Sequence, residues 1–291
     1  MIGVARTSAA ITIVNALSSG VGSAVGIDLH VEARVEVREV RSEKDAVSRF
    51  TPEPPSALVR ETLRRAIAQY FPTHAVAADL HLTSEIPVAR GLKSSSAVTT
   101  AVLFAVARAA GHPPTSLEVA RLAAAIGRDT GVSATGALDD AIASLEVGRF
   151  VTDNQHDEIL RHDVPEVGLG VALYVPSEQH APAPNYLASM DRERSAGETA
   201  ARAALGGDWP LAMQLNTELV ERAIGYSYEG VRDRLRAHGA IASGVSGLGP
   251  TLAAVARFDD LEHVAGAFAD DGTQRMTVGF TRLGVREGAD S

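Results

Sequence analysis

Residues 84–97 have the sequence Ser84-Glu85-Ile86-Pro87-Val88-Ala89-Arg90-Gly91-Leu92-Lys93-Ser94-Ser95-Ser96-Ala97, and this stretch joins two segments of different hydrophobic period. Before it, apolar and less apolar residues alternate over 76–82, which predicts a strand. After it, residues 97–110 are rich in alanine and valine and contain no glycine or proline, which predicts a buried helix. Pro87 ends the strand and Gly91 permits a tight turn between the two elements.

The same stretch has the composition of a loop that binds an anion. Its three serines stand at the predicted helix start, where unpaired backbone N–H groups and the positive end of the helix dipole favour negative charge. Because one serine is enough for an N-cap, three serines with a glycine and Lys93 predict a polyphosphate site. The stretch is not a Walker A loop, because Lys93 follows Gly91 by two positions and the Gly-x-x-x-x-Gly-Lys-Ser/Thr spacing is missing.

Residues 87–97 resemble the phosphate-loop signature of the GHMP kinases, which include galactokinase and the homoserine, mevalonate and phosphomevalonate kinases. The common pattern is Pro-x-x-x-Gly-Leu-Gly-Ser-Ser-Ala. Here Lys93 replaces the second glycine and a third serine is added, a departure that resembles the archaeal-type shikimate kinase branch. The resemblance implies that the loop binds ATP through Pro87, Val88, Ala89, Arg90, Gly91, Leu92, Lys93, Ser94, Ser95, Ser96 and Ala97.

A second motif contains two adjacent carboxylates, Asp139 and Asp140, between a glycine-punctuated loop and an apolar stretch. A helix N-cap would account for one aspartate but does not require the preceding Thr135-Gly136. The segment resembles the second GHMP region, Ser/Thr-Gly-x-Asp-Asn/Asp, which holds the catalytic carboxylate. Aligning the Asp-Asp pair on that pattern makes Asp139 the candidate. One extra residue between Gly136 and Asp139 leaves Asp140 open.

A third motif places Gly244, Gly247 and Gly249 between two apolar runs. Taken alone, it is typical of a hairpin with glycine turns or of a loop whose backbone approaches a ligand closely. It resembles the third GHMP motif, in which a strand, a glycine-rich loop and a strand close over the phosphate site. The resemblance therefore implies that these three glycines border ATP. Pro250 matches the shikimate and homoserine kinase forms of the motif.

The resemblance also implies roles for single side chains, with ATP and Mg²⁺ as cofactors. Ser95 would bind Mg²⁺ through its hydroxyl oxygen, which suits this hard cation. Asp129 would be a second Mg²⁺ ligand, since related kinases place an acid shortly before the catalytic segment. Lys93 would stabilise charge on the transferring phosphoryl group. Asp139 would accept or orient the proton of the acceptor hydroxyl, and the sequence leaves open whether it acts as a base or as an electrostatic aid.

The remaining chain predicts further strands and helices on both sides of residue 150. Strict alternation over 25–37 predicts a long strand with one face in water, and the resemblance implies that residues 15–28 contribute to the acceptor site. Residues 151–166 are polar and are interpreted as an interdomain crossing. We further expect helices at 195–206, 210–225, 229–238 and 259–270, strands at 168–175 and 275–283, and a polar loop at 177–194.

The fold class implied by the resemblance is α+β, a two-part GHMP kinase-like fold. An N-terminal α/β half, residues 1–150, carries the phosphate loop. The chain then crosses over into a C-terminal, ferredoxin-like half, residues 151–291.

Composition narrows the possible partners. The chain has 291 residues and a net charge of −9, which disfavours nucleic acid and anionic membranes as partners. It contains no cysteine, which excludes disulfides, thiolate catalysis and cysteine-ligated zinc and fits a cytoplasmic protein. No uncharged apolar stretch approaches the roughly 20 residues of a membrane span. The histidines lack the spacing of a transition-metal site.

The resemblance implies an ATP-dependent kinase that phosphorylates a hydroxyl of a small metabolite, with shikimate favoured as acceptor and shikimate 3-phosphate, an intermediate of aromatic amino-acid biosynthesis, as product. The alternatives are a homoserine or mevalonate kinase and a non-catalytic nucleotide- or RNA-binding domain. The negative charge and Asp139 oppose the last of these. Sequence alone leaves open the oligomeric state and the arginines that would bind the acceptor carboxylate.

Overall fold

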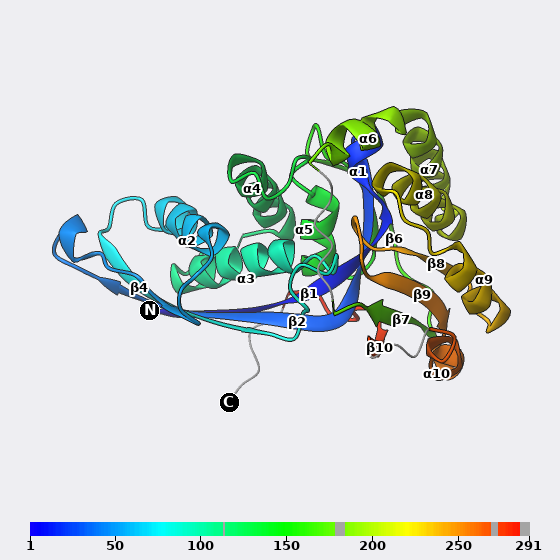
Figure 1. Cartoon of the computed structure of the whole chain (residues 1–291). Coiled ribbons are helices and arrows are strands. Elements are labelled where there is room, and N and C mark those ends of the chain that lie inside the picture. The colour runs from blue at the N-terminus through cyan, green and yellow to red at the C-terminus, as the bar shows by residue number, and fades with distance from the viewer. Residues whose placement is uncertain (113, 178–183, 269–272, 286–291) are drawn as a thin grey trace.

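The computed structural model describes residues 1–112, 114–177, 184–268 and 273–285, and its strands form two sheets (Figure 1). In the first sheet the strand order is β3-β4-β2-β5-β6, with β1 paired to β2. Its strands are β1 (Ile2–Val14), β2 (Val21–Glu39), β3 (Arg49–Thr51), β4 (Val76–Ser84), β5 (Arg149–Asp153) and β6 (Glu158–Asp163).

A long antiparallel hairpin of β1 and β2 is the base of the N-terminal half. Strand β2 confirms the long strand predicted over 25–37. The short helix α1 (Ala16–Ser19) turns the chain between them: Asn15 accepts the backbone N–H of Leu17, and Gly20, at φ 80°, ends the helix. Four helices lie together on one face of this sheet (Figure 1): α2 (Ala57–Tyr70), α3 (Ser94–Ala109), α4 (Ser116–Asp129) and α5 (Leu138–Leu145).

Side chains cap two of these four helices at their start, α2 and α4. Ser56 accepts the backbone N–H of Val59 at the start of α2, and Thr115 with Glu118 forms the predicted capping box of α4. Helix α3 begins at Ser94, the first of the three serines predicted at the helix start. Lys93 turns the chain into it in a left-handed conformation, with φ 62°, and makes no side-chain capping hydrogen bond.

The C-terminal half confirms the ferredoxin-like prediction. Its sheet has the order β10-β7-β9-β8, the order of a split βαβ fold. The strands are β7 (Leu169–Val175), β8 (Ala242–Val245), β9 (Leu252–Arg257) and β10 (Gln274–Gly279), and the helices are α6 (Tyr186–Arg192), α7 (Arg194–Gly206), α8 (Trp209–Ile224), α9 (Glu229–Ala237) and α10 (Leu261–Ala265). A bridge between Ile27 and Phe280 joins the two sheets.

Three predictions of local structure were wrong. Residues 151–166 are not a crossing: β5 and β6 form a hairpin on the edge of the first sheet, and the exposed face of β6 explains the polar sequence. The N-terminal sheet thus extends past the predicted boundary at residue 150, to Asp163. The loop predicted at 177–194 contains α6, and its residues 178–183 lie outside the described ranges.

The helix predicted at 259–270 is a 3₁₀ turn, Phe258–Asp260, followed by the short α10; residues 269 and 270 lie outside the described ranges. Across the described residues, no helix combines the length and the apolar character needed to cross a membrane.

Candidate active site

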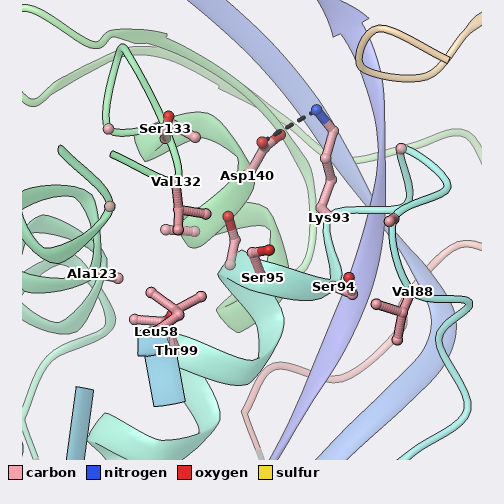
Figure 2. Close-up of a pocket in the computed structure, with 17 residues that line it drawn as sticks. Leu58, Val88, Lys93, Ser94, Ser95, Thr99, Ala123, Val132, Ser133 and Asp140 are labelled. Atoms are coloured by element: carbon pink, nitrogen blue, oxygen red, sulfur yellow. Dashed lines mark ion pairs between the residues drawn. The ribbon is translucent and has the colours of Figure 1, made fainter. Parts of the chain in front are cut away.

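A cavity of about 300 Å³ lies at the start of α3, between the phosphate loop and the start of α5 (Figure 2). The loop contributes Val88, Ala89, Gly91 and the run from Lys93 to Ser96, whereas Leu92 and Ala97 are buried beneath it. Arg90 points elsewhere and donates to the carbonyl oxygen of Ser177. The opposite end of the cavity is apolar, with Leu58, Ala123 and Val132.

The phosphate loop keeps an unusual backbone path. Ala89, Gly91 and Lys93 have φ values of 56°, 82° and 62°, in the left-handed region that side chains disfavour. At Gly91 a Cβ atom would also lie 2.2 Å from the carbonyl oxygen of Ser246. This position therefore requires glycine for its backbone angle and for its packing against the third motif.

Lys93 and Asp140 form a largely buried ion pair in the cavity. Nζ of Lys93 lies 3.2 Å from Oδ2 of Asp140, and the side chains are 13% and 10% exposed (Figure 2 shows the pair as a dashed line). Oδ1 of Asp140 is buried and has no hydrogen-bond partner among the residues that the structure describes. Burial raises the pKa of Asp140, and the charge of Lys93 opposes that rise.

Asp139 occupies a different environment from its neighbour. Its Oδ1 accepts a 2.9 Å hydrogen bond from the side-chain amide of Asn154, whose Oδ1 accepts from the Thr152 hydroxyl at 2.7 Å. Burial first, and then the nearby charge of Asp140, raise the pKa of Asp139 to about 7. Because Lys93 contacts Asp140 directly, Asp140 is the member of the pair that stays ionised while Asp139 holds a proton.

A second cavity, of about 180 Å³, adjoins the first and shares with it both Lys93 and Asp140. Asp139 lines only this second cavity. Hydroxyl and amide groups complete it, and they come from Thr12, Asn15, Ser133, Thr135 and Tyr186. The described residues that line it include no arginine. The ion pair thus stands where two compartments meet.

Ser246 connects the third motif to the phosphate loop by hydrogen bonds, and its side chain is fully buried. Its hydroxyl donates to the carbonyl oxygen of Gly91 at 2.7 Å and accepts the backbone N–H of Thr12 at 3.2 Å. The Thr12 hydroxyl in turn accepts the N–H of Gly247 at 2.9 Å. One buried hydroxyl therefore joins strand β1, the phosphate loop and the glycine loop.

The structure separates the predicted glycines and does not bring Asp129 to the site. Gly247 lines the second cavity. Gly249 and Gly244 line neither cavity: they pack against Tyr226 and Thr217, which would lie 2.5 and 2.4 Å from an added Cβ. Asp129 lines neither cavity and accepts a 3.0 Å hydrogen bond from Arg65. Two further residues, Ser246 and Thr12, were not predicted from the sequence: Ser246 lies inside the third motif, and Thr12 has no distinguishing pattern around it.

Ser246→Ala is expected to lower the free energy of unfolding by about 1–3 kcal/mol, because Gly91 and Thr12 would each lose a buried hydrogen-bond partner. Urea unfolding measures this loss. Thr251→Val is a matched control, since the Thr251 hydroxyl is buried nearby without a partner in the described structure, and it should cost less. Equal losses in the two variants would contradict the role assigned to Ser246.

The raised pKa of Asp139 predicts a pH-dependent stability. The usual pKa is 3.8 and the folded value is about 7, so between these values the folded state holds a proton that the unfolded state has lost. The free energy of unfolding then falls as pH rises through this window, by at most about 1.4 kcal/mol per pH unit. In Asp139→Asn this contribution should vanish. Urea unfolding from pH 5 to 8 tests this, and equal slopes in the two proteins would refute it.

Comparisons with known proteins identify the family of the chain. Residues 57–148 match the family model described as GHMP kinases N terminal domain. The chain is 35% identical over 281 residues to a shikimate kinase from Halobacterium salinarum, covering 96% of this chain and 97% of the relative. It is 31% identical over 267 residues to a shikimate kinase from Methanosarcina mazei, with coverages of 92% and 89%.

The fold also resembles a solved homoserine kinase structure from Cytophaga hutchinsonii, with a TM-score of 0.71 and 15% identity, covering 98% of this chain and 96% of that one. At this identity the likeness concerns the fold alone.

Proposed function

Because the chain belongs to the GHMP kinase family, in the branch of the archaeal shikimate kinases, we propose that it transfers the γ-phosphoryl group of ATP to a hydroxyl of shikimate. The product would be shikimate 3-phosphate, and the enzyme would act in the cytoplasm. The observation that carries the proposal is the buried Lys93–Asp140 pair, which lines both cavities. A phosphoryl group that passes between the two cavities would pass close to the Lys93 ammonium group and the Asp140 carboxylate.

The larger cavity suits ATP. Its polar end holds Ser94, Ser95 and Ser96 at the start of α3, where free backbone N–H groups and the helix dipole favour phosphate oxygens. Its apolar end, at Leu58 and Ala123, would take the adenine base. Phosphoryl transfer depends mainly on positioning and on charge neutralisation, and this cavity provides both.

In the proposed reaction, Asp140 rather than Asp139 meets the acceptor hydroxyl. Oδ1 of Asp140 is buried and has no hydrogen-bond partner among the described residues, and we propose that the carboxylate turns so that this oxygen accepts the proton of that hydroxyl. The ammonium group of Lys93, held at Oδ2, stabilises negative charge that develops on the transferred group. Asp139 already has a partner in Asn154 and does not line the ATP cavity, so we give it no direct part in the transfer, and Lys93 supplies the counter-charge of Asp140.

The donor atoms in the larger cavity also fit Mg²⁺. They are hydroxyl oxygens of the three serines and a carboxylate oxygen of Asp140, and this cation prefers oxygen ligands and keeps several waters. We propose that Ser95 holds it together with phosphate oxygens. The ion would neutralise phosphate charge. Asp129 is a weaker candidate than the sequence implied, because Arg65 occupies its carboxylate and it lies outside both cavities.

The smaller cavity suits a polyhydroxylated acceptor. Its lining combines the Thr12, Ser133 and Tyr186 hydroxyls with the Asn15 amide, and such groups exchange hydrogen bonds with several ring hydroxyls. Asn15 lies in the region for which the family resemblance implied an acceptor role.

The direct test is ADP release by the purified protein with Mg²⁺ and ATP, with shikimate, homoserine or mevalonate offered separately. We expect turnover with shikimate alone. Turnover with one of the other acceptors would support the kinase activity and refute shikimate as the acceptor. ATP binding without turnover on any of them would refute the proposed transfer to these acceptors.

A further inference from the structure

A third cavity, of about 190 Å³, lies in the C-terminal half between α8, α9 and β8, elements that sit side by side (Figure 1). Arg232 and Arg236 line it from α9, Gln214 from α8 and Ser243 from β8. No carboxylate is among its described lining residues, so the charges that face it are positive.

Arg232 is buried, and only part of its guanidinium group has a hydrogen-bond partner among the described residues. Its side chain is 7% exposed, and Nη2 lies 2.9 Å from Oε2 of Glu221. The Nε atom is buried and has no hydrogen-bond partner in the described ranges. Buried polar groups are nearly always paired. Glu221 contacts only one of the guanidinium nitrogens of Arg232. The other carboxylate oxygen of Glu221 accepts the backbone N–H of Tyr228.

Arg236 provides a second guanidinium on the same side of α9. Residues 232 and 236 are four apart, so their side chains lie on one helix face. The contact of Arg236 with Asp233, at 3.1 Å, joins two side chains that are each 63% exposed, and such pairs are weak. Arg236 can therefore turn to a ligand at little cost.

We propose that this cavity binds a small oxyanion, a phosphate or a carboxylate, separately from the phosphate loop. The planar fork of arginine donors matches these groups, and Ser243 and Gln214 add polar side chains. The volume is below the roughly 300 Å³ at which pockets for drug-sized ligands begin, which favours a small ion or a short acid.

The proposed site is connected by direct contacts to the glycine loop, of which Gly247 lines the second cavity of the candidate active site. Arg232 holds Glu221, Glu221 holds the backbone of Tyr228, and the Tyr228 hydroxyl donates to the carbonyl oxygen of Pro250 at 3.0 Å. Strand β8, which lines the cavity, continues directly into the glycine loop. In this chain of contacts, only Glu221 and Tyr228 lie between Arg232 and the glycine loop.

The test follows the side-chain Nε–H signal of Arg232 by ¹H–¹⁵N NMR during titration with inorganic phosphate, and separately with acetate, at constant ionic strength. Loss of the signal in Arg232→Lys assigns it. We expect a saturable shift with at least one of the two probes. Saturation with phosphate alone, acetate alone or both would identify the class of ion, and saturation with neither would overturn the proposal.

Arg236→Gln should weaken the apparent affinity at least about tenfold, the effect of losing a charge-assisted hydrogen bond. Arg234→Gln is the matched control: Arg234 lies on the same helix, does not line the cavity and donates to the carbonyl oxygen of Ala267. A shift transmitted from phosphate bound at the phosphate loop would be unaffected by Arg236→Gln. Equal affinities in the two variants would therefore also overturn the proposal.

Discussion

Asp140→Asn is expected to lower kcat for acceptor-dependent ADP release by about 10²- to 10⁴-fold, the usual contribution of a positioned proton acceptor, with the KM for ATP little changed. The carboxylate lies 3.2 Å from Lys93 where the two cavities meet, and its buried Oδ1 has no hydrogen-bond partner among the residues that the structure describes. Asparagine keeps the shape of the side chain but is neutral and a poor proton acceptor. Steady-state kinetics at saturating ATP measures the effect.

Asp139→Asn is the matched control, because it changes the adjacent carboxylate, which does not line the ATP cavity. Its pKa of about 7 means that the folded protein holds a protonated Asp139 in much of the population near neutral pH, a state that asparagine resembles. The loss of kcat should therefore be much smaller. A large loss in Asp139→Asn with activity retained in Asp140→Asn would return the catalytic role to Asp139. Circular dichroism must show both variants folded, since Asp140→Asn leaves the buried Lys93 without its counter-charge.

Gly91→Ala is expected to weaken ATP binding by at least about 100-fold, because the displaced phosphate loop would lose two or more of its hydrogen bonds to phosphate. The added Cβ would lie 2.2 Å from the backbone oxygen of Ser246, at a φ of 82°. Backbone on both sides must shift, and the loop would lose its contact with the glycine motif. Calorimetric titration with a non-hydrolysable ATP analogue measures the affinity.

Gly111→Ala is a control that distinguishes backbone strain from steric collision as the cause of weaker ATP binding in Gly91→Ala. Gly111 also has a positive φ, 73°, but no atom lies within 4 Å of an added Cβ. This control carries the backbone strain without the collision, so it should cost about 1–2 kcal/mol of stability and keep ATP affinity. A normal ATP affinity in Gly91→Ala would show that the approach of the two loops is not needed for binding.

The sequence predicted most of the elements that carry the motifs because their signals are local. The alternation in β2, the capping box at Thr115 and the alanine-rich α3 each depend on residues within a few positions. The hairpin of β5 and β6 was missed because an edge strand with an exposed face resembles a polar linker. Its pairing with β2 depends on residues more than one hundred positions away.

The candidate site was predicted in its parts but not in its arrangement. The motif pattern left Asp139 and Asp140 open, because one extra residue follows Gly136. In the structure both carboxylates line the second cavity and only Asp140 also lines the first, a difference in three-dimensional placement that the motif spacing does not give. The role of Ser246 depends on two contacts with residues far away in the sequence, which no local pattern reveals.

The most direct test of the proposed phosphoryl transfer is ³¹P NMR of the products formed from ATP, Mg²⁺ and shikimate, compared between the wild type and Asp140→Asn. We expect ADP and a phosphate monoester at the 3-hydroxyl of shikimate in equal amounts, with the monoester formed at least about 100-fold more slowly by the variant. Inorganic phosphate as the only new product besides ADP, or a monoester formed equally well by Asp140→Asn, would contradict it.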